Sequence, residues 1–323
     1  MAPVALGIIG FGIMGERLLR TAFPHPEVRV AGVWDPSPEA AARLAAVDPA
    51  VPMLPDAAAV IAACDTLYIA APPAAHIPLA RAALAAGRAV FLEKPLATDL
   101  AEAAAFVAEA EASGARAAVN FPMASSPAVA QLAAWRAAGQ VGQPRGLEIA
   151  TDFGRWPRGW QHGAVGWLAR RAEGGFTREV VSHFLFLTLR QLGALELRSA
   201  RVTWPEGDLS ETAIEAELLA GGVPVRLTGS VGRIAEDEAN RWVLAGEAGS
   251  VRLRNWSIAE RLESDGVWRP APDALPNEAM RPMVLRGQMD KLAALTRGAP
   301  ETGLATLREA LTVQQIVEEL LRS

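Results

Sequence analysis

The first 121 residues alternate between short apolar runs and longer amphipathic segments. The apolar runs have the length of buried strands and lie at 4–10, 28–35, 66–73, 88–95 and 115–121. Between them, apolar residues recur at helical spacing over 12–23, 37–47, 76–87 and 99–114. Strands that alternate with helices of this length are typical of βαβ units. The pattern therefore predicts an N-terminal Rossmann domain, with a doubly wound parallel sheet.

Residue types at the ends of these segments support the helix assignments. Ser37 followed by Pro38 predicts a helix that is capped by Ser37 and has proline at its first position. Asp99 is a suitable cap for the helix after it, and Gly87 is a suitable C-terminal stop.

The pattern changes after residue 122. Helices are expected at 126–139 and 175–193, with a strand at 145–153 between them and a loop rich in Arg, Trp and Gly over 154–172. Six further strand-like runs follow without helices between them, at 197–204, 212–220, 223–231, 241–247, 250–256 and 258–264. Two helices close the chain, around 283–298 and 304–321. We therefore expect residues 1–122 to bind a dinucleotide, and residues 123–323 to form an α+β domain for substrate binding and oligomerisation, with a largely antiparallel open sheet.

Composition and charge narrow the class of protein. The net charge of −5 argues against a nucleic-acid partner or a polybasic membrane surface. Cys64 is the single cysteine, which excludes an intrachain disulfide and suits a reducing compartment. The apolar runs are shorter than the roughly 18–20 residues needed to cross a bilayer, and none resembles a signal peptide. These features predict a cytoplasmic enzyme.

Three glycines follow the first predicted strand. Gly10, Gly12 and Gly15 fit G-x-G-x-x-G and lie where a helix begins, as a pyrophosphate-binding turn requires. The second strand ends in Asp35, at the distance expected for a group that binds the ribose hydroxyls and repels a 2′-phosphate. Because proline follows Asp35, NAD is preferred over NADP. The alternative for Asp35 is a turn residue.

Two further motifs follow later strands, APPAAH at 71–76 and EKP at 93–95. Together with GFGIMG at 10–15, they resemble the glucose–fructose oxidoreductase/inositol dehydrogenase/MocA family. This resemblance covers nearly the whole chain and implies an NAD(P)-dependent oxidoreductase that acts on sugars, cyclitols or related compounds. It also implies a cis peptide bond between Lys94 and Pro95. The cofactor-binding residues that we expect are Gly10, Phe11, Gly12, Ile13, Met14, Gly15, Asp35, Ala71, Pro72, Pro73, His76, Glu93 and Lys94.

Lys94 is one of only two lysines among 31 basic residues. Arginine keeps its proton at any working pH, whereas a lysine can share a proton with a substrate oxygen. We therefore expect Lys94 to be catalytic. The alternative is a structural ion pair with Glu93, which is awkward because adjacent strand residues point to opposite faces.

The second half of the catalytic site is implied by the same resemblance. The family has a glycine-rich turn and then a helix with Asp and, four residues later, His. In EGGFTREVVSHF, His183 matches the His and Glu179 replaces the Asp. A spacing of four places both on one helix face, so the carboxylate can orient the imidazole. Glu179 adds a methylene group, so its role is open, and His183 has the alternative of a core residue.

The 154–172 loop offers cations and aromatic faces for a substrate. Such groups suit a carboxylate or a sugar ring, but Trp and Arg also mark subunit contacts. The substrate-binding residues that we expect are Arg155, Trp156, Arg158, Trp160 and Arg178.

A homodimer or homotetramer through the C-terminal sheet is expected. Trp204, Trp242, Trp256 and Trp268 fall on or beside its strands and would supply apolar area on an open face. No metal site is expected, because the His residues are scattered and Cys64 has no partner at ligand spacing.

The resulting hypothesis is hydride transfer between a nicotinamide and a carbinol or carbonyl carbon of a small polar substrate. Two alternatives remain open. One is a non-redox enzyme that holds NAD tightly, and the other is a non-catalytic protein that senses the nucleotide.

Overall fold

A computed structural model describes residues 2–323, with the side chains of 162–164 left out of the description. The chain forms two compact units. The first contains residues 1–125 and 282–311, and the second contains residues 126–281 and 312–323. The sequence predicted one boundary after residue 122. In the structure the chain returns to the first unit near its end, so each unit is built from two segments.

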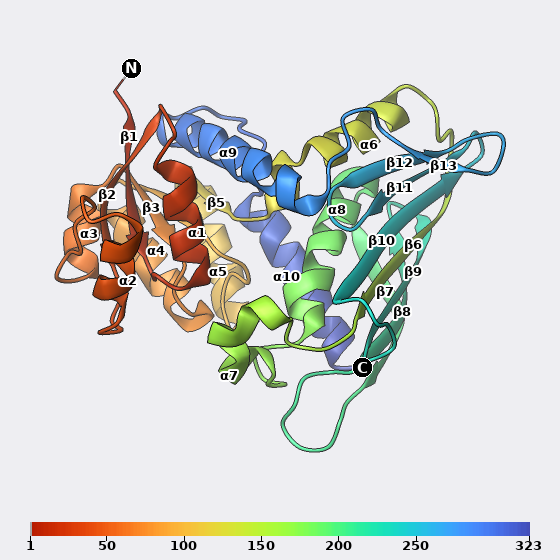
Figure 1. The fold of residues 1–323 in the computed structure, drawn as a ribbon, viewed down its shortest axis with the longest axis horizontal. Coiled ribbons are helices and arrows are strands. Elements are labelled where there is room, and N and C mark those ends of the chain that lie inside the picture. The colour runs from red at the N-terminus through yellow and green to blue at the C-terminus, as the bar shows by residue number, and fades with distance from the viewer. Residues whose placement is uncertain (1) are drawn as a thin grey trace. The chain divides into compact units, whose positions relative to one another are not determined.

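The first unit contains a parallel sheet of five strands in the order β2-β1-β3-β4-β5. The strands are β1 (Val4–Ile9), β2 (Val28–Trp34), β3 (Thr66–Ile69), β4 (Ala89–Leu92) and β5 (Ala117–Val119). The helices are α1 (Ile13–Ala22), α2 (Ala40–Val47), α3 (Ala57–Ala63), α4 (His76–Ala85) and α5 (Leu100–Ala112), which alternate with the strands (Figure 1). Strands β1, β3 and β4 are buried along their whole length, as expected for a sheet covered on both faces. The predicted doubly wound sheet is confirmed.

Two local predictions in this unit differ from the structure. Helix α2 begins at Ala40 with Glu39 as its N-cap, so Ser37 is not the cap. The Ser37 hydroxyl donates instead to the Glu39 carboxylate, and the Ser37 amide donates to Asp35 Oδ1 (2.8 Å) in a turn directly after β2. Helix α3 was not expected from the sequence, and it is capped by Asp56, which accepts from the Ala59 amide (2.7 Å).

The second unit contains an eight-stranded sheet in the order β13-β12-β11-β10-β6-β9-β8-β7. The strands are β6 (Pro144–Phe153), β7 (Leu195–Thr203), β8 (Ala213–Ala220), β9 (Val223–Val231), β10 (Glu238–Gly246), β11 (Ser250–Arg254), β12 (Ile258–Leu262) and β13 (Trp268–Pro270). Neighbouring strands are antiparallel except β6 and β9, which are parallel. The predicted α+β arrangement with a largely antiparallel sheet is confirmed.

Helices in the second unit cover one face of this sheet. Those that pack on the sheet are α6 (Pro127–Ala137) and α8 (Ser182–Leu192), and the unit also contains α7 (Val165–Leu168) and a π-helical turn, η4, over Thr177–Val181. Figure 1 shows α8 lying along the sheet. Trp242 of β10 is fully buried and donates its indole N–H to Thr188 Oγ1 of α8 (2.9 Å). Trp242 therefore belongs to the inner face and cannot supply apolar area to an open face, contrary to the expectation from the sequence.

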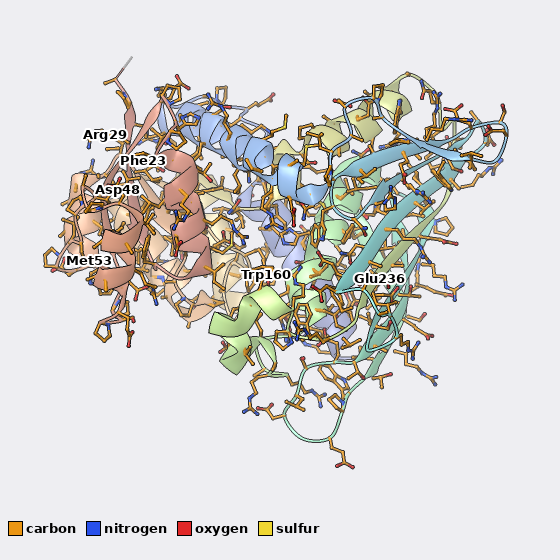
Figure 2. All side chains as sticks on the ribbon, viewed as in Figure 1. Phe23, Arg29, Asp48, Met53, Trp160 and Glu236 are labelled. Atoms are coloured by element: carbon orange, nitrogen blue, oxygen red, sulfur yellow. The ribbon has the colours of Figure 1, made fainter. Side chains whose placement is uncertain are left out.

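The other face of the sheet carries many charged side chains. Alternate residues of the central strands are exposed, among them Glu148, Glu217, Arg226 and Arg241, and polar side chains project from this side in Figure 2. Glu148 and Glu217 are the cross-strand neighbours of Arg226, so the charges alternate in sign. The homo-oligomer expected from the sequence stays a prediction.

The two closing helices are α9 (Asn277–Thr296) and α10 (Leu307–Leu321), as the apolar periodicity predicted. The part of α9 that belongs to the first unit contributes Met289, Leu292 and Ala293 to the core around β1 and α1. No helix in residues 2–323 combines the length and the low polarity that crossing a membrane requires.

Candidate cofactor and substrate sites

The turn between β1 and α1 depends on two glycines. Gly10 has φ +91°, and a Cβ there would lie 2.5 Å from the Ala70 carbonyl. A Cβ at Gly15 would lie 2.0 Å from the Gly10 oxygen, so helix α1 can approach the turn only because residue 15 has no side chain. These contacts explain why the first and third positions of the motif are glycine.

Gly12 differs from both, because nothing lies within 4 Å of the position of its Cβ and the residue is exposed. It is also the N-cap of α1, whose first amides lack intrahelical partners. Open space beside unpaired N–H groups fits the pyrophosphate of a dinucleotide. The predicted phosphate turn thus has the geometry that such a cofactor requires.

Asp35 lies directly beside this turn. Its Oδ2 accepts the Phe11 amide (2.6 Å), while Arg43 of α2 donates to the Phe11 carbonyl (2.9 Å). The carboxylate is therefore anchored at the end of β2, and each oxygen retains a lone pair that a ribose hydroxyl could use. Arg43 was not predicted, because it lies in the middle of an Ala-rich helix and matches no motif.

His76 joins the turns that follow β3 and β4. The side chain is buried, with Nδ1 2.8 Å from the Pro95 oxygen and Nε2 2.8 Å from the Ala71 oxygen. Burial lowers the pKa of His76, and the hydrogen bonds to the two carbonyls oppose this shift. The imidazole thus contacts backbone at both predicted cofactor motifs, and its own contact with a cofactor stays a prediction.

The turn after β4 contains the cis peptide bond between Lys94 and Pro95 that the resemblance implied. Lys94 is partly exposed, whereas Glu93 beside it is buried. The Glu93 carboxylate accepts from the Tyr68 hydroxyl (2.5 Å) and from the Asn120 amide (2.7 Å). Burial and the nearby Glu93 charge hold the pKa of Tyr68 well above its usual range. Glu93 thus connects the Lys94–Pro95 turn to the strands on either side of β4.

This connection continues into α9, again within the first unit. Gln288 is fully buried, donates to Asn120 Oδ1 (2.9 Å) and accepts from the Ser125 hydroxyl (2.6 Å). The buried network therefore runs from Tyr68 to Gln288, and it could not be predicted from the sequence because its members are scattered along the chain.

In the second unit, Glu179 and His183 lie on a helix whose first turn is wider than predicted. The Ser182 amide bonds to the Thr177 carbonyl five residues earlier, as in a π-helix. Such turns often occur at functional sites. Both side chains are partly exposed, and His183 contacts Trp256 with ring centroids 5.5 Å apart.

The glycine-rich turn before this helix is held by a buried carboxylate that the sequence analysis missed. Glu211 accepts the Thr177 amide (2.7 Å), and a Cβ at Gly175 (φ +99°) would lie 2.1 Å from Glu211 Oε2. Burial raises the pKa of Glu211. Gly175 therefore makes room for the carboxylate that holds the helix start.

Arg178 is occupied by contacts within the second unit. It donates to both carboxylate oxygens of Glu318 (2.6 and 2.8 Å) and to the carbonyls of Arg171 and Gly174. Four of its five N–H groups are thereby used. This geometry supports a structural role for Arg178, and its predicted contact with substrate remains untested.

The predicted substrate residues of the 154–172 loop have different environments. Trp156 packs between Phe153 and Phe176, with centroids 5.1 and 6.2 Å away, and donates to the Leu168 carbonyl. Arg158 is buried and pairs with Glu238 (3.0 Å). Arg155 is exposed, and so is Trp160, which is labelled in Figure 2 beside α7. Trp160 and Arg155 are therefore the members of this set that are accessible to a ligand.

Comparison with protein families gives one match to the first unit. Residues 4–121 match the model of an oxidoreductase family with an NAD-binding Rossmann fold. Among proteins with curated descriptions, none matches the sequence.

Solved structures resemble the whole chain at low sequence identity. An oxidoreductase from Agrobacterium radiobacter in complex with NAD⁺, L-tartaric acid and magnesium has a TM-score of 0.83 and 18% identity, over 100% of this chain and 97% of that one. UDP-N-acetylglucosamine 3-dehydrogenase from Acidithiobacillus ferrooxidans has a TM-score of 0.79 and 21% identity, over 99% and 97%. An oxidoreductase from Thermotoga maritima has a TM-score of 0.82 and 16% identity, over 99% and 96%.

The family match and the structural likenesses agree with the motifs. The glycine turn, Asp35 and the Lys94–Pro95 turn all lie within the matched residues, and the likenesses extend the shared fold to the second unit. Residues 4–121 thus match the glucose–fructose oxidoreductase/inositol dehydrogenase/MocA oxidoreductase family with its NAD-binding Rossmann fold, and the likeness over the rest of the chain is one of fold.

Proposed function

We propose that the protein is a dehydrogenase or reductase for a sugar, a cyclitol or a related polyhydroxylated compound. Hydride passes between the nicotinamide of NAD and a carbinol or carbonyl carbon of the substrate. The observation that carries this proposal is the Lys94–Pro95 turn, where a partly exposed ammonium follows a buried and hydrogen-bonded carboxylate in a domain built for NAD.

Each charged group has a proposed role. When bound, the cofactor supplies or accepts the hydride. Lys94 binds the oxygen on the reacting carbon and stabilises the charge that develops there, and His183 is proposed as the group that takes or gives a proton of the substrate. Glu179 supports His183. Glu93, held by Tyr68 and Asn120, keeps the Lys94 backbone in place.

The substrate class draws support from the relatives and from the residue types in the second unit. The Acidithiobacillus ferrooxidans relative is named for a sugar nucleotide, and the Agrobacterium radiobacter relative was crystallised with a hydroxy acid. Exposed Trp160 and Arg155 are suited to a sugar ring and to an anionic group, respectively. Cyclitols, sugar nucleotides and hydroxy acids are therefore the compounds to test.

The test is a single-turnover absorbance measurement of reduced nicotinamide with enzyme in excess of NAD⁺. The panel contains myo-inositol, UDP-N-acetylglucosamine, D-glucose, D-sorbitol and L-tartrate. An increase in the absorbance of reduced nicotinamide with one of these compounds supports the proposal. Product without reduced cofactor in solution, together with NAD that copurifies, would instead indicate the non-redox enzyme.

The second alternative has its own signature. A nucleotide sensor would bind NAD, measured by calorimetry, but would show neither absorbance change nor product with any compound of the panel. Retention of its biological function in a Lys94→Ala variant would favour this alternative further, because a sensor does not need the ammonium.

A further inference from the structure

The turn between β11 and β12 has an unfavourable backbone. The Ser257 amide bonds to the Arg254 carbonyl (3.3 Å) and closes a turn whose central residues are Asn255 (φ 45°) and Trp256 (φ 74°). Positive φ at both central residues is the pattern of a type I′ turn, in which the second residue is usually glycine. Within residues 2–323, these two are the non-glycine residues with positive φ. A bulky side chain is strained there because its Cβ approaches backbone atoms.

The indole of Trp256 is held in place on several sides. Its ring lies 5.5 Å from that of His183 at an interplanar angle of 77°, and 5.2 Å from that of Phe184. Its N–H donates to Glu238 Oε1 (3.2 Å). The strained turn therefore places one indole against the imidazole that the proposed function treats as catalytic.

Glu238 joins this turn to the 154–172 loop. Its second oxygen accepts from Arg158 (3.0 Å), and Arg158 in turn donates from Nε to Gln161 (3.1 Å). The Arg158 guanidinium lies over the Trp160 ring, 4.8 Å from the centroid. One carboxylate thus fixes Trp256 and, through Arg158, contacts the exposed Trp160.

A second unfavourable feature lies next to the same turn. Asn240 and Asn255 are tied by two bonds, from the Asn240 amide to Asn255 Oδ1 (3.1 Å) and from the Asn255 amide to the Asn240 carbonyl (2.8 Å). The Asn240 side chain is 2% exposed, yet within residues 2–323 neither its nitrogen nor its oxygen has a hydrogen-bond partner. Backbone strain and an unsatisfied amide in one place are typical of sites kept for function rather than for stability.

The chemistry beside the indole indicates what it binds. Trp256 and His183 are both partly exposed, so a flat apolar surface adjoins polar ring nitrogens and the Glu238 carboxylate. A cyclic polyol has an apolar face of C–H groups and an edge of hydroxyl groups, which match these two surfaces. We propose that Trp256 is the specificity-determining residue of this enzyme and stacks on the ring face of a cyclic polyhydroxylated substrate beside His183. This inference rests on the proposed function and names its substrate class.

The experiment compares a cyclic probe with an open-chain probe. Binding and steady-state oxidation of myo-inositol and D-sorbitol are measured for the wild type, Trp256→Ala and Trp256→Phe, with calorimetric NAD⁺ affinity measured separately. Trp268→Ala is the matched control, because Trp268 is also a partly exposed Trp of this sheet but lies under Arg252, 4.3 Å from the ring centroid.

For Trp256→Ala, we expect the Kd or KM of myo-inositol to rise about tenfold or more, the effect of losing one stacking contact. The kcat, the Kd or KM of D-sorbitol and the Kd of NAD⁺ should each change by less than about threefold, because these values do not depend on the stacking contact. Trp256→Phe should restore most of the affinity because it keeps an aromatic face, and Trp268→Ala should leave all values unchanged.

Several results would overturn the inference. Equal losses for the two probes, or no loss in either Trp256 variant, would exclude ring stacking. A wild-type protein that neither binds nor oxidises any cyclic compound of the panel would exclude it as well. If Trp256→Ala does not fold, Trp256→Leu takes its place, because leucine fills volume without an aromatic face.

This outcome is separable from the fate of the proposed function. Binding of myo-inositol that depends on Trp256, without formation of reduced cofactor, would support the inference and contradict the redox proposal. Formation of reduced cofactor at the same rate in the wild type and in Trp256→Ala would support the redox proposal and contradict the inference about Trp256.

Discussion

The predicted cofactor site of the first unit and the region around His183 in the second unit are built from different kinds of groups. In the first unit, the proposed functional residues follow strands of one parallel sheet, with Gly10, Asp35 and Lys94 after β1, β2 and β4, and the glycine turn acts through its backbone. In the second unit, the proposed site consists of side chains from distant elements, with His183 on α8, Trp256 on a turn and Glu238 on β10. Backbone binding tolerates few substitutions, whereas side-chain binding can change with the substrate.

The largest expected effect tests whether the first unit contributes more than backbone. Lys94→Met should lower kcat by about 10²–10⁴-fold, since it removes the group that acts on the substrate oxygen. NAD⁺ affinity, measured by calorimetry on the same variant, shows how far Lys94 also binds the cofactor, as the sequence predicts. Lys94→Arg keeps the charge but not the ability to share a proton, and we expect intermediate activity. If Lys94→Met is as active as the wild type, the first unit binds the cofactor but contributes no side chain to proton transfer.

A pair of glycine variants tests the backbone side of the comparison directly. Gly10→Ala should lower the free energy of unfolding by at least about 2 kcal/mol, because its φ is positive and the new Cβ meets the Ala70 carbonyl. Gly12→Ala should fold normally, since its Cβ meets nothing, but should bind NAD⁺ more weakly because that methyl group takes up the space proposed for the pyrophosphate.

Urea denaturation and calorimetric titration separate these two effects. The comparison fails if Gly12→Ala loses stability rather than affinity, or if Gly10→Ala is as stable as the wild type.

In the second unit, a pH-dependent test uses Glu211. Its pKa is raised by burial, so the folded state prefers the protonated form, and the stability of the wild type should fall as pH rises from about 4.5 through the folded pKa. Glu211→Gln keeps an acceptor for the Thr177 amide without the charge. It should therefore be more stable than the wild type at pH 8, with the difference disappearing near pH 4.

Urea denaturation between pH 4 and 8 measures this difference, and Glu211→Ala serves as the comparison because it lacks the acceptor. A gap between wild type and Glu211→Gln that is constant over this range would mean that the charge is not the cause.

The smallest expected effect concerns Asn240. Asn240→Leu replaces an amide without a partner among the described residues by an apolar group of similar size, and should raise stability by about 1 kcal/mol. If Asn240 serves the substrate, affinity for the cyclic probe falls in the same variant. A loss of stability in thermal unfolding would show that the amide has a structural role.

The sequence predicted local structure correctly where the residues concerned lie near one another in the chain. The three glycines, Asp35 and the Lys94–Pro95 turn were predicted because each follows a strand in an alternating pattern, and the cis bond followed from the family resemblance. The helix that carries His183 was also predicted from its apolar periodicity. Its π-helical first turn was not predicted, because this periodicity does not distinguish a single wider turn from an α-helical one.

The residues that sequence reasoning missed come together only through strand pairing. Glu238 and Trp256 are 18 residues apart and meet because β10 pairs with β11. Glu211 and Thr177 are 34 residues apart. The sequence contains a weak signal for the turn between β11 and β12, because Asn is common at the first central position of a type I′ turn. It does not indicate which ring the Trp256 indole contacts. Trp242 was misplaced because strand alternation alone did not show which face the helices cover.

The two contacts of His76 have one further consequence. A neutral imidazole carries a single N–H, yet both ring nitrogens face carbonyl oxygens, of Ala71 and of Pro95. Each tautomer therefore satisfies one carbonyl and leaves the other facing a lone pair. A proton on Nε2 lets the imidazole donate to Ala71, after β3, and a proton on Nδ1 lets it donate to Pro95, after β4. Moving the proton from Nδ1 to Nε2 would therefore make the hydrogen bond after β3 and break the one after β4, without any change in net charge.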